Sequence, residues 1–503
     1  MDPIDQLKRE LKIVADIRGA TSVLHWDQET YMPPGSGLAR ADQIAVLESL
    51  AHEHLVGPAV RDPLSELVDL DTGRLKQELP QEDARLVEEI WRDYHLAAAL
   101  PKAFVEEYAQ TTARGQQVWA QARRENKFAD FVPHLKKIVE LKYREIGYLG
   151  KKDTPYDTLL DQFEPGMTSA YITHLFDELK AGLVPMVQAI ARSDVDTHTD
   201  LLHQAYDVAK QWAFGERVLK DMGFDFNCGR QDKSVHPFTT EFHPTDVRIT
   251  TRIKPDDLMY CFSSTIHEGG HALYEQGLDP VWYGTPFDQA ISYGIHESQS
   301  RMWENLVALS KPFWKHYYPQ LQETFPENLG AVPLEHFYSA INTVTPSLIR
   351  TEADEMTYNL HIMLRYEVER MVINDHFPVG ELPELWNEKM EEYLGLRPPT
   401  DADGVLQDIH WSMGAFGYFP TYALGNLYNI IIYERVKKDI PDLEERISRG
   451  DLLVLLNWLR EHIHRLGRRR KALELIESLA DGPLTSQPFL KYLKAKYQEI
   501  YPL

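Results

Sequence analysis

The sequence predicts a mainly α-helical protein that carries one small β-sheet. Apolar residues recur at three- and four-residue spacing over most of the chain, as expected for amphipathic helices. One segment near the middle alternates apolar and polar residues instead, which is typical of a half-buried strand. The segments between these patterns are short and rich in turn formers, and no internal repeat is present. We therefore expect one unit over 1–503, with an N-terminal helical region of about 1–230 and a second region of about 231–503.

The first helix is predicted from an apolar stripe near the N-terminus, formed by Ile4, Leu7, Leu11, Val14 and Ile17. Stripes with the same spacing predict further helices within 81–125, 132–149, 169–192, 200–222 and 451–480. Turn-forming residues predict breaks at 31–37, 193–200 and 397–404. The basic run RRRK falls inside the last helical pattern, so we expect a solvated helix face rather than a nucleic-acid patch at 468–471.

The strand is predicted within 236–254, which reads HPFTTEFHPTDVRITTRIK. Val247, Ile249 and Thr251 alternate there with Arg248 and Thr250, the two-residue period of a strand with one buried face. A small sheet is therefore expected immediately before the motif that carries the chemistry.

Composition excludes several classes of partner. The formal net charge is −24, from 77 acidic and 53 basic residues, and such a surface repels nucleic-acid backbones and anionic membranes. Only two cysteines occur, which fits a reducing compartment better than a disulfide framework. The N-terminus lacks the basic and apolar regions of a signal peptide, and no segment is apolar enough to span a bilayer. We expect a soluble, cytoplasmic protein.

The motif HEGGH at 267–271 predicts a metal site. On a helix, His267 and His271 project from the same face one turn apart, so both imidazoles can bind one ion. Glu268, one step round the helix, can take a proton from a water that the ion activates. Gly269 and Gly270 each cost about 1 kcal/mol in a helix interior, so their presence indicates close approach of another backbone or a ligand.

A catalytic zinc site normally has three protein ligands, so a third ligand is needed. Glu275 shares the helix face of the histidines but lies about 12 Å along the axis from His267, which is too far. The third ligand must come from another element. Spacing favours Glu297, in a second helical pattern, over Asp288, and the acidic residues that follow the motif are Asp279, Asp288, Glu297 and Glu304.

Several segments together resemble the carboxypeptidase Taq family of HExxH zinc metallocarboxypeptidases. HEGGH is followed after 24 residues by HESQ at 296–299, and further matches are WDQETYMP at 26–33, HPF at 236–238, DVRIT at 246–250, IRTEAD at 349–354 and GVLQDIHW at 404–411. The resemblance implies that Glu297 is the third ligand. It also implies a zinc cofactor, removal of C-terminal residues from peptides with broad preference, and a homodimer. The implied fold has helical lobes around a deep active-site groove, as in angiotensin-converting enzyme and neurolysin. Two histidines and a glutamate also bind cobalt or manganese.

The resemblance further assigns His410 and Tyr422 to the reaction. In related peptidases a histidine and a tyrosine at similar separation donate hydrogen bonds to the tetrahedral intermediate, and Tyr418 competes with Tyr422 for that role. Gly414, Gly417, Pro420 and Gly425 predict that 412–425 is a loop rather than a regular helix.

Arg350 is the candidate clamp for the substrate's C-terminal carboxylate, because a guanidinium can hold a carboxylate through two hydrogen bonds. It stands at the start of a helical pattern, and the alternative is an intrahelical ion pair with Asp354. Arg248 is a second candidate clamp. His236 is expected to support a ligand or contact substrate rather than bind metal.

These residues predict a metal-dependent carboxypeptidase that acts on peptides with a free C-terminal carboxylate. Two alternatives remain: an endopeptidase with the same metal chemistry and no clamp, and a non-catalytic helical scaffold with a structural metal. Glu268 argues against the scaffold, because a closed structural site needs no general base.

Overall fold

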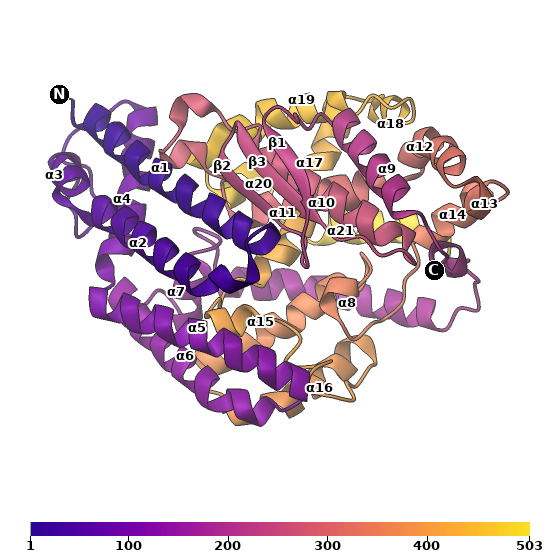
Figure 1. Ribbon diagram of the computed structural model, residues 1–503, viewed down its shortest axis with the longest axis horizontal. Helices are drawn as coiled ribbons and strands as arrows, with labels where there is room; N and C mark the ends of the chain where they lie inside the picture. The colour runs from indigo at the N-terminus through magenta and orange to yellow at the C-terminus, as the bar shows by residue number, and fades with distance from the viewer. Residues whose placement is uncertain (1) are drawn as a thin grey trace.

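Figure 1 shows a computed structural model of the chain, which describes residues 2–503. Four helices at one end, coloured from indigo to purple, form the start of the chain: α1 (Pro3–Thr30), α2 (Gly37–Val56), α3 (Pro58–Leu67) and α4 (Gln81–Ala99). Ile4, Leu7, Leu11 and Val14 are buried, as the stripe predicted. They belong to an apolar cluster of α1–α4 that is separate from the main core and also contains Phe287.

Five further helices lead to the sheet: α5 (Lys102–Glu125), α6 (Phe128–Leu149), α7 (Pro155–Leu160), α8 (Ser169–Ala191) and α9 (Val208–Asp221). Helices were expected over 132–149 and 169–192, and α6 and α8 confirm them. The pattern over 81–125 is two helices rather than one, because Pro101 lacks the backbone N–H that would continue α4. The pattern over 200–222 becomes regular α-helix only at Val208.

The sheet has three strands, β1 (Gly229–Lys233), β2 (Thr239–His243) and β3 (Asp246–Thr251), in the order β1-β3-β2. β3 runs parallel to β1 and antiparallel to β2. Val247 and Ile249 are fully buried, which confirms the alternating pattern. In Figure 1 the strands lie in the middle of the molecule beside α10 (Leu258–Glu275), the helix that follows them. The sheet therefore packs against the helix that carries HEGGH.

The C-terminal half is helical and completes the main core. Its helices are α11 (Tyr293–Arg301), which continues as a π-helix over Met302–Ala308, α12 (Lys311–Thr324), α13 (Pro326–Leu329), α14 (Leu334–Ile341), α15 (Tyr358–Asn374), α16 (Leu382–Leu394), α17 (Pro420–Asp439), α18 (Leu443–Ile447), α19 (Leu453–His462), α20 (Ala472–Ala480) and α21 (Gln487–Tyr497). α11 packs on both α10 and α17. This crossing of three helices builds the site described below.

The expected single helical pattern over 451–480 is interrupted. α19 ends at His462, a short 3₁₀ segment spans His464–Arg469, and Gly467 adopts a left-handed conformation. The expectation of a solvated face at 468–471 is wrong for Arg468, whose guanidinium is largely buried and pairs with Glu89 and Asp93 of α4. The run therefore ties the C-terminal half to the α1–α4 helices.

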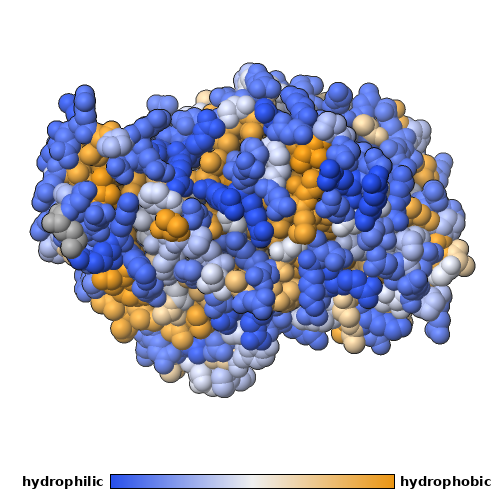
Figure 2. Space-filling model, turned by 90° about the horizontal axis from the view of Figure 1, so that it is seen from above, coloured by the Kyte–Doolittle hydropathy of each residue, from blue (hydrophilic) through white to orange (hydrophobic). Residues whose placement is uncertain are grey.

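Seen from above, the surface is mostly hydrophilic, with separate apolar patches between the charged regions (Figure 2). Within residues 2–503, none of the helices combines the length and the apolar character that crossing a bilayer requires.

Candidate active site

α10 presents both histidines of HEGGH on one face. The helix begins at Leu258, where Asp257 caps it by accepting hydrogen bonds from the N–H groups of Met259 and Tyr260 at 3.2 and 3.1 Å. Ile266 and Leu273 are fully buried on the core side. The opposite side turns toward α11 and an open cavity.

Gly270 allows α11 to cross α10 at close range. A Cβ atom at Gly270 would lie 2.7 Å from the Cα of Ser300, which no folded chain tolerates. A Cβ atom at Gly269 would instead meet the end of a side chain, Leu219 Cδ1 of α9, at 2.4 Å. The expectation that the glycines indicate close approach of another backbone is confirmed for Gly270, whereas Gly269 meets only side chains.

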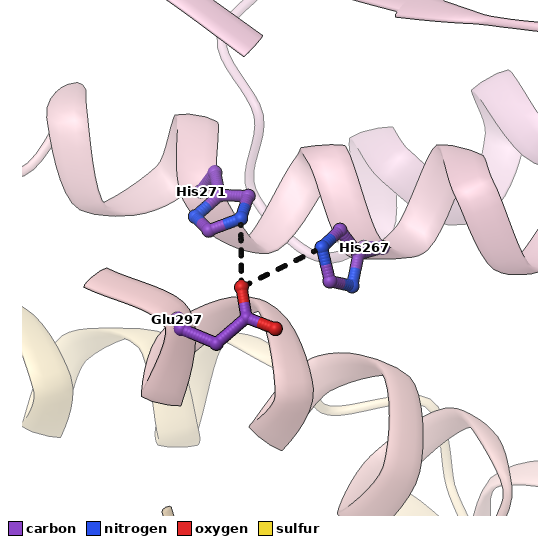
Figure 3. A group of neighbouring side chains, drawn as sticks. All are labelled: His267, His271 and Glu297. Atoms are coloured by element: carbon purple, nitrogen blue, oxygen red, sulfur yellow. Dashed lines mark ion pairs between the residues drawn. The ribbon is translucent and has the colours of Figure 1, made fainter. Parts of the chain in front are cut away.

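Glu297 points from α11 toward both histidines, as Figure 3 shows. Its Oε2 atom lies 3.8 Å from His267 Nε2 and 3.4 Å from His271 Nε2. Zinc ligands at about 2.0–2.1 Å in a tetrahedron are about 3.3 Å from one another, so this spacing suits one ion. Within the described part of the chain, these three residues form the group whose donor atoms all lie within 4.8 Å of one another. The donor set therefore fits zinc.

A second set of side chains orients His267 and Glu297. Glu304 lies 2.8 Å from His267 Nδ1, and since a carboxylate only accepts, the imidazole donates there and leaves Nε2 for a metal. Arg301 donates to Glu297 Oε1 at 2.8 Å and to Glu304 at 3.2 Å. Although burial opposes ionisation, Arg301 and His267 hold the pKa of Glu297 well below its usual range. The carboxylate is therefore ionised, as a metal ligand must be.

His271 is kept neutral by its surroundings. Burial and the neighbouring His296, whose ring stacks on it at 4.3 Å, lower the pKa of His271 to about 3. His296 in turn pairs with Glu275 at 2.7 Å. Glu275 thus acts beside the site rather than as a ligand, in agreement with its distance along the helix.

Glu268 is buried beside the ligands and borders the cavity. Its Oε2 accepts a hydrogen bond of 2.6 Å from the hydroxyl of Thr239 on β2. Burial raises the pKa of Glu268, while His267 and the Thr239 hydroxyl lower it. A carboxylate with a raised pKa, held in one orientation next to a metal site, has the properties of a general base.

Sequence reasoning missed Thr239 as the partner of Glu268. The signal was present, since Thr239 stands directly after the HPF segment on a predicted strand. It also missed the orienting roles of Arg301 and His296 and considered Glu304 only as a ligand. Glu304 and His296 lie 37 and 21 residues from their partners, and spacing does not reveal such contacts. Arg301 stands four residues after Glu297 on the same helix, a spacing that could have identified this pair.

A cavity of about 640 Å³ opens over His267, His271 and Glu297 and is also bordered by Glu268, Tyr293, Tyr418 and Tyr422. Asp288, the alternative ligand, also borders it but is outside the group of three donors. The expected loop at 412–425 is only partly correct, because α17 begins at Pro420 and Tyr422 is helical. Proline is tolerated in a first helical turn, where its missing N–H would have no partner in any case.

His410 and Tyr422 are neighbours in the structure. His410 Nε2 lies 3.2 Å from the Tyr422 hydroxyl. Burial and the nearby cations of Arg350 and Arg365 outweigh Asp408 and lower the pKa of His410 to about 3, so its imidazole is neutral. The Tyr418 ring also contacts His410, at 5.5 Å between centroids.

Arg350 is buried beside this pair. It lies in a 3₁₀ turn, Arg350–Glu352, and not at the start of a helix, which begins only at Tyr358. The alternative pairing with Asp354 is wrong, because Arg350 pairs with Asp408 at 2.9 Å and donates to the Tyr358 hydroxyl at 3.0 Å. The Tyr422 ring centroid is 5.0 Å from the guanidinium carbon.

The other two candidate residues lie apart from this group. Arg248 pairs with Asp246 at 2.9 Å and stacks on Trp26 of α1 at 4.4 Å, so it joins the sheet to the first helix. Neither Arg248 nor His236 borders the cavity, although Pro237 and Phe238 do. His236 is exposed, and its carbonyl accepts a hydrogen bond from Ser234.

Comparison with known proteins identifies the family of the chain. The model of the carboxypeptidase Taq (M32) metallopeptidase family matches residues 6–497. Carboxypeptidase 1 of Bacillus subtilis is 37% identical over 493 residues, 98% of this chain and 97% of the relative. Thermostable carboxypeptidase 1 of Thermus thermophilus is 40% identical over 506 residues, 99% of this chain and 98% of the relative.

Solved structures of the same family superimpose over nearly the whole chain. An M32 carboxypeptidase from Deinococcus radiodurans has a TM-score of 0.95 at 40% identity and covers 100% of both chains. A carboxypeptidase from Pyrococcus furiosus has a TM-score of 0.94 at 37% identity, with 99% of each chain covered. The chain therefore belongs to the carboxypeptidase Taq (M32) family and is a metallocarboxypeptidase.

Proposed function

We propose that this enzyme removes single residues from the free C-terminus of peptides with broad preference, with zinc held by His267, His271 and Glu297. The observation that carries the proposal is the position of Glu268, which borders the same cavity as the donor set and is held by Thr239. Bound zinc would lower the pKa of a water molecule toward ~7 and polarise the peptide carbonyl.

The protein's own groups then move protons and hold charge. Glu268 takes a proton from the attacking water and passes it to the nitrogen of the leaving residue. The hydroxyl of Tyr422 is placed to donate a hydrogen bond to the oxyanion, and the neutral imidazole of His410, 3.2 Å away, supports that hydroxyl or donates directly. Tyr418 is the competing donor, because it borders the same cavity.

Arg350 is proposed to bind the substrate carboxylate, and charge around it supports this role. Asp408 stands between Arg350 and Arg365, so two buried cations share one carboxylate and an excess of positive charge remains. A guanidinium has five N–H donors, and the contacts to Asp408 and Tyr358 use at most three of them. Arg350 does not border the cavity in this conformation. The Tyr422 side chain, which borders the cavity and lies over the guanidinium, must therefore shift before the substrate carboxylate can reach Arg350.

The test compares peptide pairs that differ only at the C-terminus. Each peptide is supplied as free acid and as amide, and the products are identified by mass spectrometry. We expect stepwise loss of single C-terminal residues from the acids and little cleavage of the amides. Equal internal cleavage of both members would favour the endopeptidase alternative and overturn the proposal.

Three further parts of the proposal extend beyond the site. Zinc is proposed as the metal, with cobalt or manganese as substitutes, because a site of two imidazoles and a carboxylate accepts all three. The chain is proposed to act as one catalytic unit in the cytoplasm, a compartment that suits its two unpaired cysteines. A homodimer, typical of the resembled family, is proposed and is checked by light scattering of the eluting protein.

A further inference from the structure

Glu164 is a buried carboxylate that the proposed mechanism does not use. It lies in the turn between α7 and α8, and only 1% of the residue is exposed. Its Oε1 accepts hydrogen bonds from the Ser292 hydroxyl and the Tyr428 hydroxyl, each at 3.0 Å, and its Oε2 accepts one from the Gly294 N–H at 3.0 Å. One side chain therefore joins three segments of the chain.

These contacts provide hydrogen-bond acceptors for the first backbone N–H groups of α11. The first N–H groups of a helix have no partner within the helix. Here the Tyr293 N–H donates to the Phe163 carbonyl, the Gly294 N–H to Glu164, and the Ile295 N–H to the Ser292 hydroxyl. The turn that contains Phe163 and Glu164 thus caps the helix from outside, and a carboxylate at this end also suits the helix dipole.

Glu164 and Tyr428 pack closely against Gly294. A Cβ atom at Gly294 would lie 2.8 Å from Glu164 Oε2 and 2.9 Å from a ring carbon of Tyr428. Tyr428 belongs to α17, the helix that packs on α11 and carries Tyr422. Glu297 follows Gly294 by one helical turn, so the position of the α11 start sets the position of its carboxylate.

We propose that Glu164 is a positioning residue for the metal ligand Glu297, acting through the N-terminus of α11 and its contact with α17. The inference rests on the proposed metal site. Glu164 lies in the N-terminal region, outside every motif identified in the sequence. According to the proposal, this residue controls how tightly the site binds metal. Residues that orient ligands typically change metal affinity by roughly 10- to 100-fold when they are replaced.

Glu369 offers a matched control. It is also fully buried and accepts three hydrogen bonds, from the Tyr156 hydroxyl, the Trp411 indole and the Gly417 N–H, at 2.8, 3.0 and 2.9 Å. None of these donors lies on α10 or α11. Loss of Glu369 therefore removes a comparable buried network without touching the helices that hold the ligands.

The experiment measures zinc affinity of the metal-free protein by competition with a chromophoric chelator, together with the unfolding temperature of the same metal-free samples. We expect Glu164→Ala to weaken zinc binding by roughly 10- to 100-fold. Glu164→Gln should recover part of the affinity, because the amide oxygen still accepts from Gly294 while the hydroxyls can rotate. Glu369→Ala should lower the unfolding temperature but keep zinc affinity within about threefold of the parent, since the substitution leaves the proposed zinc ligands and their helices unchanged.

A purely structural role would give equal zinc affinities in the Glu164 and Glu369 variants at similar loss of stability, and that result overturns the proposal. Should Glu164→Ala fail to fold, Glu164→Gln is compared with Glu369→Gln. Weaker zinc binding in Glu164→Gln alone supports the proposal, and equal binding overturns it. Comparison of the parent with His267→Ala tests the metal site itself. If these two proteins bind zinc equally, the proposed function fails. If His267→Ala loses zinc binding while Glu164→Ala binds zinc normally, only the inference about Glu164 is overturned.

Discussion

Gly425 of α17 faces Glu297 of α11 so closely that a Cβ atom at Gly425 would lie 2.7 Å from the Glu297 Cγ atom. The sequence suggested that this glycine interrupts regular structure, yet it lies inside a continuous helix. Glycine is needed there because the two helices cross at Glu297, where no side chain fits between them. The close approach keeps Glu297 directed toward the histidines of α10.

Gly425→Ala is therefore expected to weaken metal binding. Alanine favours a helix by about 1 kcal/mol over glycine, but forcing a methyl group into a filled space costs about 1–3 kcal/mol. We expect a lower unfolding temperature and a lower metal content after dialysis. Gly147 of α6 is the control, because a Cβ there would meet no atom within 4 Å, so Gly147→Ala should keep metal and gain stability. A Gly425→Ala protein as stable and as metal-rich as the parent would contradict the close-packing account.

Replacing a metal ligand should lower metal occupancy and activity together. His267→Ala, His271→Ala and Glu297→Ala each remove one of three donors, and none is spare in a three-ligand site. Metal content per chain is measured by elemental analysis after dialysis against a weak chelator. If Glu297→Ala kept full metal and a near-normal rate, the ligand assignment would be wrong and Asp288, on the same cavity, would be tested next.

Glu268→Gln should separate metal binding from turnover. The glutamine amide cannot take a proton from water, whereas the three metal ligands are unchanged. Loss of a general base typically lowers the rate by ~10²–10⁴. Steady-state kinetics on a free-acid peptide are compared with metal content for the same preparation. A rate within tenfold of the parent at full metal occupancy would remove Glu268 from this role.

Arg350→Ala should cost activity selectively on free-acid peptides. Leaving a bound carboxylate unpaired costs about 2–5 kcal/mol, or roughly 30- to 3000-fold in kcat/KM at 1.4 kcal/mol per tenfold. Metal content should stay normal, because Arg350 contacts Asp408 and Tyr358 and none of the ligands. Arg248→Ala is the control, since Arg248 is engaged with Asp246 and Trp26 away from the cavity. A selective loss in Arg248→Ala with a harmless Arg350→Ala would move the clamp to Arg248.

Glu369 should make stability depend on pH in a defined direction. Burial raises the pKa of Glu369 from its ordinary 4.5 to about 7, against hydrogen bonds from Gly417, Tyr156 and Trp411 that lower it. Between these values the folded protein binds a proton that the unfolded chain has lost. The free energy of unfolding contributed by Glu369 therefore falls as pH rises from about 4.5 to about 7, and is constant above that range.

Glu369→Gln imitates the protonated side chain and should remove this dependence. Urea unfolding at several pH values between 5 and 8 gives the difference in free energy of unfolding between variant and parent. We expect that difference to shift in favour of the variant as pH rises to about 7, in line with the raised pKa. Parallel curves across the whole range would show that Glu369 is already ionised at pH 5.

Local patterns in the sequence were enough to predict several elements of the fold and of the site. The apolar stripe of α1, the alternation in β3 and the face of α10 are set by neighbours within one or two turns, so periodicity reports them. HEGGH places His267 and His271 one turn apart on any helix, and Gly270 of the glycine pair correctly indicated a close crossing of another backbone. The family resemblance supplied Glu297, which spacing alone had only favoured over Asp288.

The tertiary structure determined which residues that are far apart in the sequence lie next to each other. Thr239 reaches Glu268 from 29 residues away, Glu304 reaches His267 from 37, and Arg350 pairs with Asp408 from 58. No periodicity encodes such distances, because they follow from how separate helices pack rather than from the conformation of one segment. The same reason explains why Tyr422 and Gly425 lie in a helix where a loop was expected. Proline and glycine lower helix propensity locally, but the packing of α17 against α11 favours the helix. Because Gly425 has no side chain, the two helices can approach closely there.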